Sequence, residues 1–537
     1  MMRRDFVKLI GLGGAVLSIS GSTFLLNACY DGGGGGGNGS NFDPRNSEGF
    51  SNPLLVPGDD GIFGFFEPQS PFEIISKEMP IPILPGKSTN SMVYEVNQGG
   101  KTYINPIIKM RKGDQFNPTL RNELSEETII HWHGFHVDHE NDGHPSEAIS
   151  PGGNYPYSFT VLNRAATYFY HPHPHGLTGK QLYFGLASIF IVEDEEEINL
   201  RNSLDLSLGE TDIPMVIQDK IFDDDGNLIY GLNPMENPTA MEQTMGFLGD
   251  VILANWTVKP FLDVSTRIYR FRILNESNSR LYKLAFLRGS EKLPFYIIGT
   301  DGGLLEKPYQ VTEAFIGVAE RVDILFDFRS LQVGDSIYLK SLFFDPMDIM
   351  TSDMEFMESS TLMNGEEFFI LKLNIKESIP YDKQVPETLS IISPIDTSGA
   401  TERFFSLPNP VEGLWFINNL RFNVNEVPVS VSRNTVEIWR IENGPLAMPH
   451  PMHIHGFQFQ VLERLNSPEQ IKSLAIDDKG RLPTDKGWKD TVLVWPGETV
   501  RLAIDFSIPF PGEQIYLFHC HILEHEDQGM MINYKVV

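Results

Sequence analysis

The stretch HCHILEHEDQGMM (residues 519–531) places one of the chain's two cysteines directly between two histidines. In a β-strand, successive side chains point to opposite faces, so Cys520 would face one site and its two histidine neighbours another. A thiolate, two imidazoles and a weak thioether ligand form a blue-copper electron-transfer site. Zinc sites more often gather several cysteines or a carboxylate, and iron–sulfur clusters need several cysteines. The stretch therefore favours copper bound by residues on strands.

Histidine is confined to four short segments of the chain. All 14 histidines lie within residues 131–144, 171–175, 450–455 and 519–525. Each segment contains His-x-His, and residues i and i+2 of a strand share a face, so each pair offers two imidazoles to one site. A single pair would more often be structural, but four pairs in one chain reverse that judgement. Because imidazole suits Zn, Cu, Fe and Ni, the segments predict a site for several metal ions.

Length and charge bound the class of protein. A chain of 537 residues predicts about two to four domains. Its 71 acidic residues outnumber 42 basic ones, for a formal net charge of −29. Phosphate contacts require a basic face, so this balance argues against a nucleic-acid partner. We expect a monomer.

Short strand-like runs dominate the body of the chain. Runs such as TYFYH (167–171) and RIYRFRILN (267–275) alternate with turns rich in Gly, Pro and Asn, a pattern typical of β-sandwiches. An acidic run at 193–197 and the stretch ESIPYDKQVPET (377–388) predict two boundaries. The predicted domains are residues 51–197, 198–380 and 381–537.

The N-terminus carries the pattern of an export signal. Arg3 and Arg4 precede a weakly apolar stretch that ends in LNAC, which resembles a lipobox with Cys29 as the lipidated residue. We predict a twin-arginine lipoprotein signal peptide (1–28), a glycine-rich tether (29–50), and a periplasmic or cell-surface lipoprotein held to the membrane only by its lipid. The alternative is an uncleaved membrane anchor. With Cys29 lipidated, Cys520 is the only remaining thiol, so no disulfide is expected.

Together, HWHG (131–134), HPHPHG (171–176), HPMHIHG (450–456) and HCHILEHEDQGMM resemble the four copper signatures of the multicopper oxidases. They follow the family's order at the two ends of the chain, and the resemblance is strongest to bacterial periplasmic cuprous oxidases. It implies an all-β fold of three consecutive cupredoxin-like Greek-key sandwiches. It also implies a type 1 copper in the third domain, a trinuclear copper cluster between the first and third, and a middle domain that is a spacer.

The resemblance assigns a role to each matching position, for four copper ions in all. The type 1 ligands would be His450, Cys520, His525 and Met530. The type 2 ligands would be His131 and His453, and the type 3 ligands His133, His171, His173, His455, His519 and His521. Four histidines match no ligand position and are interpreted as loop residues or neighbours of ligands: His136, His139, His144 and His175. Asp142 and Glu526 match acidic positions credited with proton delivery.

The chemistry of oxygen explains why several metals would be needed. Reducing O₂ to two waters takes four electrons, whereas typical donors give one at a time. An oxidase that stores electrons on several metals avoids releasing half-reduced oxygen. It needs one metal that accepts electrons and others that bind oxygen.

Methionines suggest a cuprous substrate. Met347, Met350, Met354 and Met357 have the spacing of one helix face, and Met448 matches a methionine of the cuprous-substrate site in the relatives. Thioethers select Cu(I), although a methionine stripe can equally pack against a sandwich. Leu446 stands where the relatives have an acidic residue, and their long Met-rich insertion in the third domain is missing.

These departures leave several functions open. The predicted activity is oxidation of Cu(I) coupled to O₂ reduction, with a role in copper tolerance. A laccase-like oxidase of phenols, aromatic amines or Fe(II) is the first alternative. A copper-binding protein without turnover, or a copper-free structural relative, is the second, although such structural relatives have lost ligands that this chain keeps.

Overall fold

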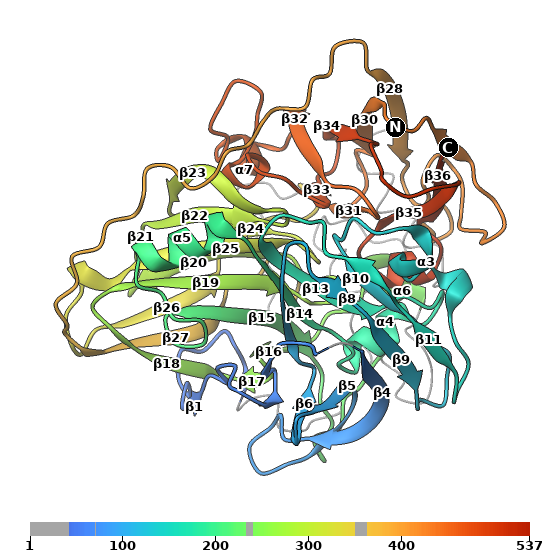
Figure 1. Ribbon diagram of the computed structural model, residues 1–537. Coiled ribbons are helices and arrows are strands. Elements are labelled where there is room, and N and C mark those ends of the chain that lie inside the picture. Colours follow the sequence, from blue (N-terminus) through green and yellow to red (C-terminus); the bar gives the residue numbers. More distant parts are fainter. Residues whose placement is uncertain (1–41, 70, 232–239, 349–361) are drawn as a thin grey trace, which may run out of the picture.

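The computed structural model describes residues 42–69, 71–231, 240–348 and 362–537. The predicted signal peptide, Cys29 and most of the tether lie outside the described residues, as do Met350, Met354 and Met357. Within the described ranges, no helix combines the length and the apolar character needed to cross a membrane. Figure 1 shows three β-sandwiches, the first in blue to teal, the middle in green to yellow and the third in orange to red.

The first sandwich packs two main sheets around an aromatic-rich core. One sheet has the order β10 (Ile130–His133), β13 (Ala166–Pro172), β14 (Ser188–Glu193), β7 (Ile107–Arg111) and β3 (Phe65–Phe66). The other has the order β11 (Asn154–Pro156), β9 (Pro118–Asn122), β4 (Phe72–Ile81), β5 (Thr89–Gln98), β6 (Lys101–Ile104) and β2 (Gly61–Ile62). Its smaller elements are β8 (Gln115–Phe116) paired with β12 (Phe159–Thr160), α3 (His139–Asp142), the 3₁₀ turn Pro145–Glu147 and α4 (Thr178–Tyr183).

The middle sandwich contains the largest core of the described chain. One sheet has the order β17 (Thr257–Val258), β16 (Val251–Ala254), β15 (Asp212–Lys220), β19 (Ile268–Asn275), β25 (Arg321–Asp327), β22 (Phe295–Thr300) and β23 (Gly303–Val311). The other has the order β1 (Asn52–Pro53), β18 (Pro260–Ser265), β27 (Phe368–Glu377), β26 (Ser336–Ser341), β20 (Tyr282–Arg288) and β21 (Glu291–Leu293), with β24 (Ala314–Ile316) also on β20. Helices α5 (Glu195–Ser203) and α6 (Ala240–Met245) and the 3₁₀ turn Phe328–Ser330 accompany these sheets.

The third sandwich has two sheets that enclose one core. Their orders are β28 (Thr401–Leu407), β30 (Val436–Asn443), β34 (Thr499–Asp505), β32 (Phe459–Leu465), and β29 (Val429–Val431), β36 (Met531–Val536), β35 (Gln514–Cys520), β31 (His450–Ile454), β33 (Thr491–Val494). Helices α7 (Glu469–Lys472) and α8 (Leu523–Asp527) and the 3₁₀ turn Pro483–Asp485 complete it. Helix α8 contacts α4 of the first sandwich and α6 beside the middle one, so it lies where all three meet.

Strand β19 shows how alternation builds a sheet that is covered on both faces. Tyr269, Phe271 and Ile273 point into the middle core. Arg270 and Arg272 take the opposite face, where they are also buried and bond to Glu197 of α5. A buried charge must be paired, and the partner Glu197 comes from the acidic run at 193–197, within which helix α5 begins.

Candidate metal centres

Eight histidines converge where the first and third sandwiches meet, and we call them the eight-histidine cluster: His131, His133, His171, His173, His453, His455, His519 and His521. Strand β10 pairs with β13 so that His131 lies opposite His171, and β31 pairs with β35 so that His453 lies opposite His519. The i, i+2 spacing then directs both imidazoles of each pair to one side. Two strand pairs from different sandwiches thus build a single site.

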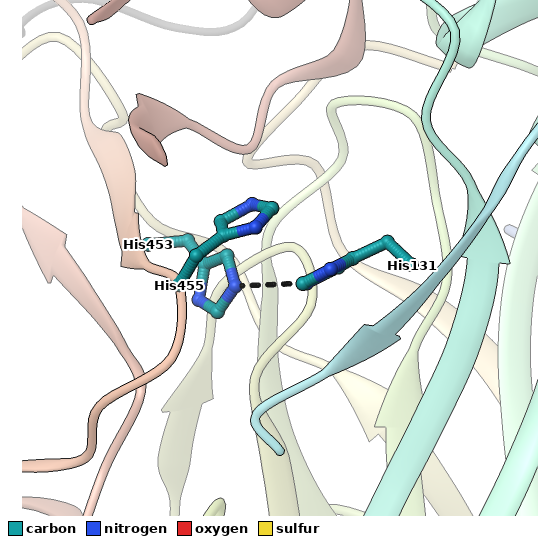
Figure 2. Close-up of side chains that lie close together, drawn as sticks. All are labelled: His131, His453 and His455. Atoms are coloured by element: carbon teal, nitrogen blue, oxygen red, sulfur yellow. Dashed lines mark hydrogen bonds between the residues drawn. The ribbon is translucent and has the colours of Figure 1, made fainter. Parts of the chain in front are cut away.

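His131 and His453 form the first group within the cluster. Their Nε2 atoms are 3.4 Å apart, and Figure 2 shows the two rings pointing toward each other, with His455 beside them. The other nitrogen of each ring contacts a backbone carbonyl, at 2.6 Å from Asp142 O for His131 and 2.8 Å from Asp490 O for His453. A carbonyl only accepts, so each Nδ1 is protonated and each Nε2 presents a lone pair to the other ring.

His133, His171 and His521 form the second group. His171 Nε2 lies 3.3 Å from His133 Nδ1 and 3.4 Å from His521 Nε2. The outer nitrogens of two of these rings have acceptors, because His133 Nε2 is 3.1 Å from Asp490 Oδ1 and His171 Nδ1 is 2.8 Å from Pro172 O. Three nitrogens from three different strand segments therefore face a common point.

His173, His455 and His519 form the third group. His519 Nε2 lies 3.0 Å from His455 Nε2 and 3.5 Å from His173 Nε2. Asp142 Oδ2 accepts from His455 Nδ1 at 2.8 Å. Glu526 lies 3.2 Å from His519 Nδ1 and 3.5 Å from His173 Nδ1, close enough for charge attraction although neither contact is aligned as a hydrogen bond. Both carboxylates thus stand directly behind imidazoles of the cluster.

Burial sets the protonation of this site. The eight rings are essentially inaccessible to solvent, and burial lowers the imidazole pKa to about 4 in His171 and about 3 in His173. Burial also raises the pKa of Asp142 well above its usual value. For Glu526 burial acts in the same direction, but the imidazoles of His173 and His519 outweigh it and lower its pKa to about 2. Neutral imidazoles with converging lone pairs are suited to bind cations.

A second constellation, the Cys520 cluster, comprises His450, Cys520 and His525. Cys520 Sγ lies 3.5 Å from His450 Nδ1 and 3.6 Å from His525 Nδ1. Met530 is fully buried in the same core, its carbonyl accepts from Cys520 N at 3.1 Å, and its own N–H donates to His525 O at 2.8 Å. Burial raises the pKa of the Cys520 thiol and lowers the pKa of His525 to about 3. A buried thiolate would need a neighbouring cation, which a metal ion supplies.

The two constellations share strand β35. Cys520 faces the third core with His450 and His525, whereas His519 and His521 on either side of it join the eight-histidine cluster. The strand alternation that the sequence predicts produces this division. One residue step of backbone therefore separates the two sites.

The middle sandwich, which the resemblance expects to be a spacer without copper ligands, contacts residues of both sites. Arg321 of β25 forms a buried ion pair with Asp490, whose carboxylate contacts His133. The backbone carbonyl of Thr244 in α6 lies 2.9 Å from His525 Nε2. The sequence signal for Arg321 is a charged residue at the start of the strand RVDILFD, which is buried along almost its whole length. A backbone carbonyl such as that of Thr244 leaves no side-chain signal.

The four remaining histidines lie outside both clusters. Three of them bridge the first and third sandwiches: His136 Nδ1 is 2.7 Å from Gly456 O, His139 N donates to Gln514, and His144 Nε2 is 2.8 Å from Asn533 Oδ1. His175 packs against the ring of Phe422.

Two of the five singled-out methionines fall in the described residues. Met448 is buried in the third core that contains Cys520, and Met347 packs against that same core from the middle part of the chain. The structure thus brings Met347 to the sandwich that holds the Cys520 cluster.

The donor sets fit copper. The Cys520 cluster offers one soft thiolate and two imidazoles, with Met530 in the same core, a set that suits copper better than zinc or a hard cation. His450 Nδ1 and His525 Nδ1 both approach Sγ, and His525 Nε2 is held by a carbonyl, so its Nδ1 lone pair is free for a metal. The groups of two and three imidazoles likewise suit copper.

Comparisons with known proteins agree with this assignment. Two family models described as multicopper oxidase match residues 81–197 and 386–537. The chain is 30% identical over 454 residues to multicopper oxidase mco of Staphylococcus aureus, covering 84% of this chain and 85% of that protein. It is 33% identical over 437 residues to a laccase of Bacillus subtilis, covering 76% of this chain and 79% of that one.

The fold is that of the same family. The crystal structure of McoA multicopper oxidase from the hyperthermophile Aquifex aeolicus superposes with a TM-score of 0.79 at 42% identity, covering 90% of this chain and 99% of that chain. This match confirms the predicted all-β fold of three consecutive cupredoxin-like sandwiches. By its motifs, its fold and its relatives, the chain belongs to the multicopper oxidases, oxidoreductases that use copper.

Proposed function

We propose that this oxidase takes single electrons at a type 1 copper and uses four of them to reduce O₂ to water at a trinuclear copper cluster. The proposed type 1 ligands are the Cys520 cluster with Met530. The pair His131 and His453 would hold a type 2 copper, and the two groups of three imidazoles would each hold one copper of a type 3 pair. The four bound ions would supply the redox chemistry, accepting electrons and binding oxygen.

One observation carries the proposal: the imidazole nitrogens converge in groups of two, three and three. The protein's own part is to fix those nitrogens, which the carbonyls and carboxylates behind them do. Asp142 and Glu526 are the proposed proton-delivering residues, because the carboxylate of each lies against imidazoles of the cluster. The backbone between His519 and His521 would link the two centres.

The favoured substrate is Cu(I), and the proposed role is copper tolerance. Met448 belongs to the core around Cys520, and Met347 packs against that core. Thioethers are soft ligands that prefer Cu(I). The B. subtilis relative is a laccase, so oxidation of phenols, aromatic amines or Fe(II) is the alternative substrate class.

The test is O₂ consumption by the copper-loaded protein with Cu(I), Fe(II) and a phenol side by side. We expect a copper content near four ions per chain, the visible absorption of a copper–thiolate bond, and the fastest O₂ uptake with Cu(I). Met347→Leu should reduce turnover of Cu(I) alone. A colourless protein after copper loading, or copper binding without O₂ uptake for any donor, would rule out the oxidase.

We also propose that residues 1–28 direct export by the twin-arginine route and that Cys29 carries the lipid of an otherwise soluble monomer. Membrane fractionation and mass spectrometry of Cys29→Ala against the wild type test this. The variant should leave the membrane fraction with its copper content unchanged.

A further inference from the structure

Helix α8 carries side chains to both metal centres, although it has only five residues, Leu523–Asp527. His525 Nδ1 lies 3.6 Å from Cys520 Sγ, and Glu526 lies against rings of the eight-histidine cluster. An isolated helix this short is unstable in water, because few internal hydrogen bonds offset the cost of ordering it. The position of α8 must therefore be set by contacts from outside the helix.

Glu526 depends on the backbone of α8 for its place. Its carboxylate is buried and lies 3.2 Å from His519 Nδ1, but neither of its oxygens makes an aligned hydrogen bond among the described residues. No hydrogen bond of its own therefore holds this carboxylate against the cluster. A shift of the helix would move Glu526 away from the imidazoles that it faces.

One residue of the middle sandwich, Asn278, holds α8 by both its backbone and its side chain. It lies in the turn between β19 and β20 and is 2% exposed. Its carbonyl accepts from the N–H of Leu523, the first residue of the helix, at 3.0 Å. Its Nδ2 donates to Glu524 Oε1 at 2.8 Å and to the carbonyl of Gly179 in α4 at 3.0 Å. The two hydrogens of this amide are thus shared between the third sandwich and the first.

Two carboxylates of α8 complete this network. Glu524 accepts two further hydrogen bonds from the middle part of the chain, from the Tyr230 hydroxyl at 2.8 Å and from Phe247 N at 3.0 Å. Asp527 accepts from Gly179 N in α4 at 2.9 Å. A Cβ on Gly179 would lie 3.0 Å from Asp527 Oδ2, so glycine permits this close approach. Helix α8 is thus bonded to both neighbouring sandwiches.

We infer that Asn278 is a positioning residue for both metal centres, because it bonds the first, middle and third sandwiches together around α8. The inference rests on the proposed function and adds a residue of the middle sandwich to it. Asn278 would act through His525 and Glu526, which the helix carries. Its Oδ1 is buried without a hydrogen-bond partner among the described residues, which costs free energy. The orientation of the amide is therefore set by the two bonds that Nδ2 donates.

The test is Asn278→Asp, which keeps the shape of the side chain but replaces the amide donor with a carboxylate that repels Glu524. Amide hydrogen exchange of residues 523–530 in the copper-free protein should become about tenfold faster, because a hydrogen bond to a charged group is lost. In the copper-loaded protein, kcat should fall about tenfold or more, because Glu526 moves with the helix. The copper–thiolate absorption should change in wavelength, because His525 moves with it as well.

Asn255→Asp is the matched control. Asn255 is also a 2% exposed amide of the middle sandwich, and its Nδ2 donates to two carbonyls, those of Leu55 and Pro214, each at 2.9 Å. None of these bonds reaches α8. The control should lower the free energy of unfolding but leave kcat and the exchange rate of α8 within about twofold of wild type. Equal changes in the two variants would mean that Asn278 contributes only to stability, which overturns the inference.

An exchange of donor and acceptor separates positioning from stability. In the double variant Asn278→Asp with Glu524→Gln, the new amide can donate to the new carboxylate while its own oxygen accepts from Phe247 N. The bond between the middle sandwich and α8 is thereby restored in the opposite direction. We expect the double variant to regain slow exchange in α8 and part of the kcat that Asn278→Asp loses. A double variant no better than Asn278→Asp overturns the inference.

Asn278→Ala is a second route if Asn278→Asp does not fold. It removes both side-chain bonds without adding a charge, and it should change exchange, kcat and absorption in the same direction by smaller factors. A folded variant in which all three are unchanged overturns the inference. A wild type without copper–thiolate absorption or O₂ uptake instead contradicts the proposed function, while exchange in the copper-free protein still decides whether Asn278 holds α8.

Discussion

The Cys520 cluster and the eight-histidine cluster adjoin each other but are built in opposite ways. The first is embedded in the apolar core of one sandwich, and the Thr244 carbonyl contacts both its His525 ring and the Trp415 indole. The second lies between two sandwiches and has three buried carboxylates directly behind its rings, from Asp142, Asp490 and Glu526. The difference matches what each site would move under the proposed function: electrons at one, and electrons with protons at the other.

The structural cost of the two designs differs as well. A buried carboxylate is expensive unless it is paired, so the eight-histidine cluster requires a supporting network. Arg321 pairs with Asp490, and Lys489 pairs with Asp301 at 2.9 Å and Glu320 at 3.1 Å. The Cys520 cluster differs, because the hydrogen-bond acceptor that its rings contact outside the cluster, among the described residues, is the neutral carbonyl of Thr244. Substitutions in the two regions should therefore impair the protein in different ways.

Cys520→Ser should have the largest effect. Serine keeps the shape but provides no thiolate, so the visible copper–thiolate absorption and O₂ uptake with every donor should fall to background. Metal analysis should still find the copper of the eight-histidine cluster, since Cys520 lies outside it. Retained colour or turnover would show that Cys520 is not the ligand through which electrons arrive.

Asp142→Asn should act on the oxygen site alone. Removing a positioned proton donor typically costs about 10²- to 10⁴-fold in rate, so kcat should drop by that order while the copper–thiolate absorption stays unchanged. Asp138→Asn is the control, because Asp138 caps helix α3 and contacts no histidine of the cluster. An equal loss of kcat in the control, or loss of the type 1 absorption in Asp142→Asn, would mean that Asp142 has a structural role and does not deliver protons.

Arg321→Met should weaken the fold. It leaves Asp490 buried and unpaired, and breaking such a pair costs roughly 3–5 kcal/mol, which denaturant unfolding of the copper-loaded protein measures. Arg329→Met removes a partly exposed pair with Asp327 and should cost about 0–1 kcal/mol. Similar losses of unfolding free energy in the two variants would show that Arg321 does not support the cluster.

The sequence predicts the division between the two sites because His-x-His spacing and strand alternation are local rules. The junction at His519, Cys520 and His521 follows from the two-residue alternation of side chains along a strand. The same rule gives the paired imidazoles of β10 and β31. The supporting contacts do not follow from such rules. Arg321 and Asp490 are 169 residues apart in the chain, and Thr244 contributes a carbonyl that every residue type has. The role of the middle sandwich therefore emerges only when the three sandwiches are packed together.

Loss of the Cys520 copper alone should have the smallest of these effects on stability, and copper removal should distinguish the regions once more. A ligand present at about 100 times its Kd stabilises the folded state by about 2.7 kcal/mol, and about 1 kcal/mol shifts Tm by roughly 2–4 °C in a domain of sandwich size. Copper in the eight-histidine cluster would join the first and third sandwiches, whereas copper at Cys520 would bind within one. Calorimetry of wild type, copper-loaded Cys520→Ser and the copper-free protein should therefore show a small drop for the loss of the Cys520 copper and a larger one for full removal. A drop for the loss of the Cys520 copper that exceeds the further drop on full removal would mean that the apolar site, and not the one between sandwiches, contributes the greater part of the copper-dependent stability.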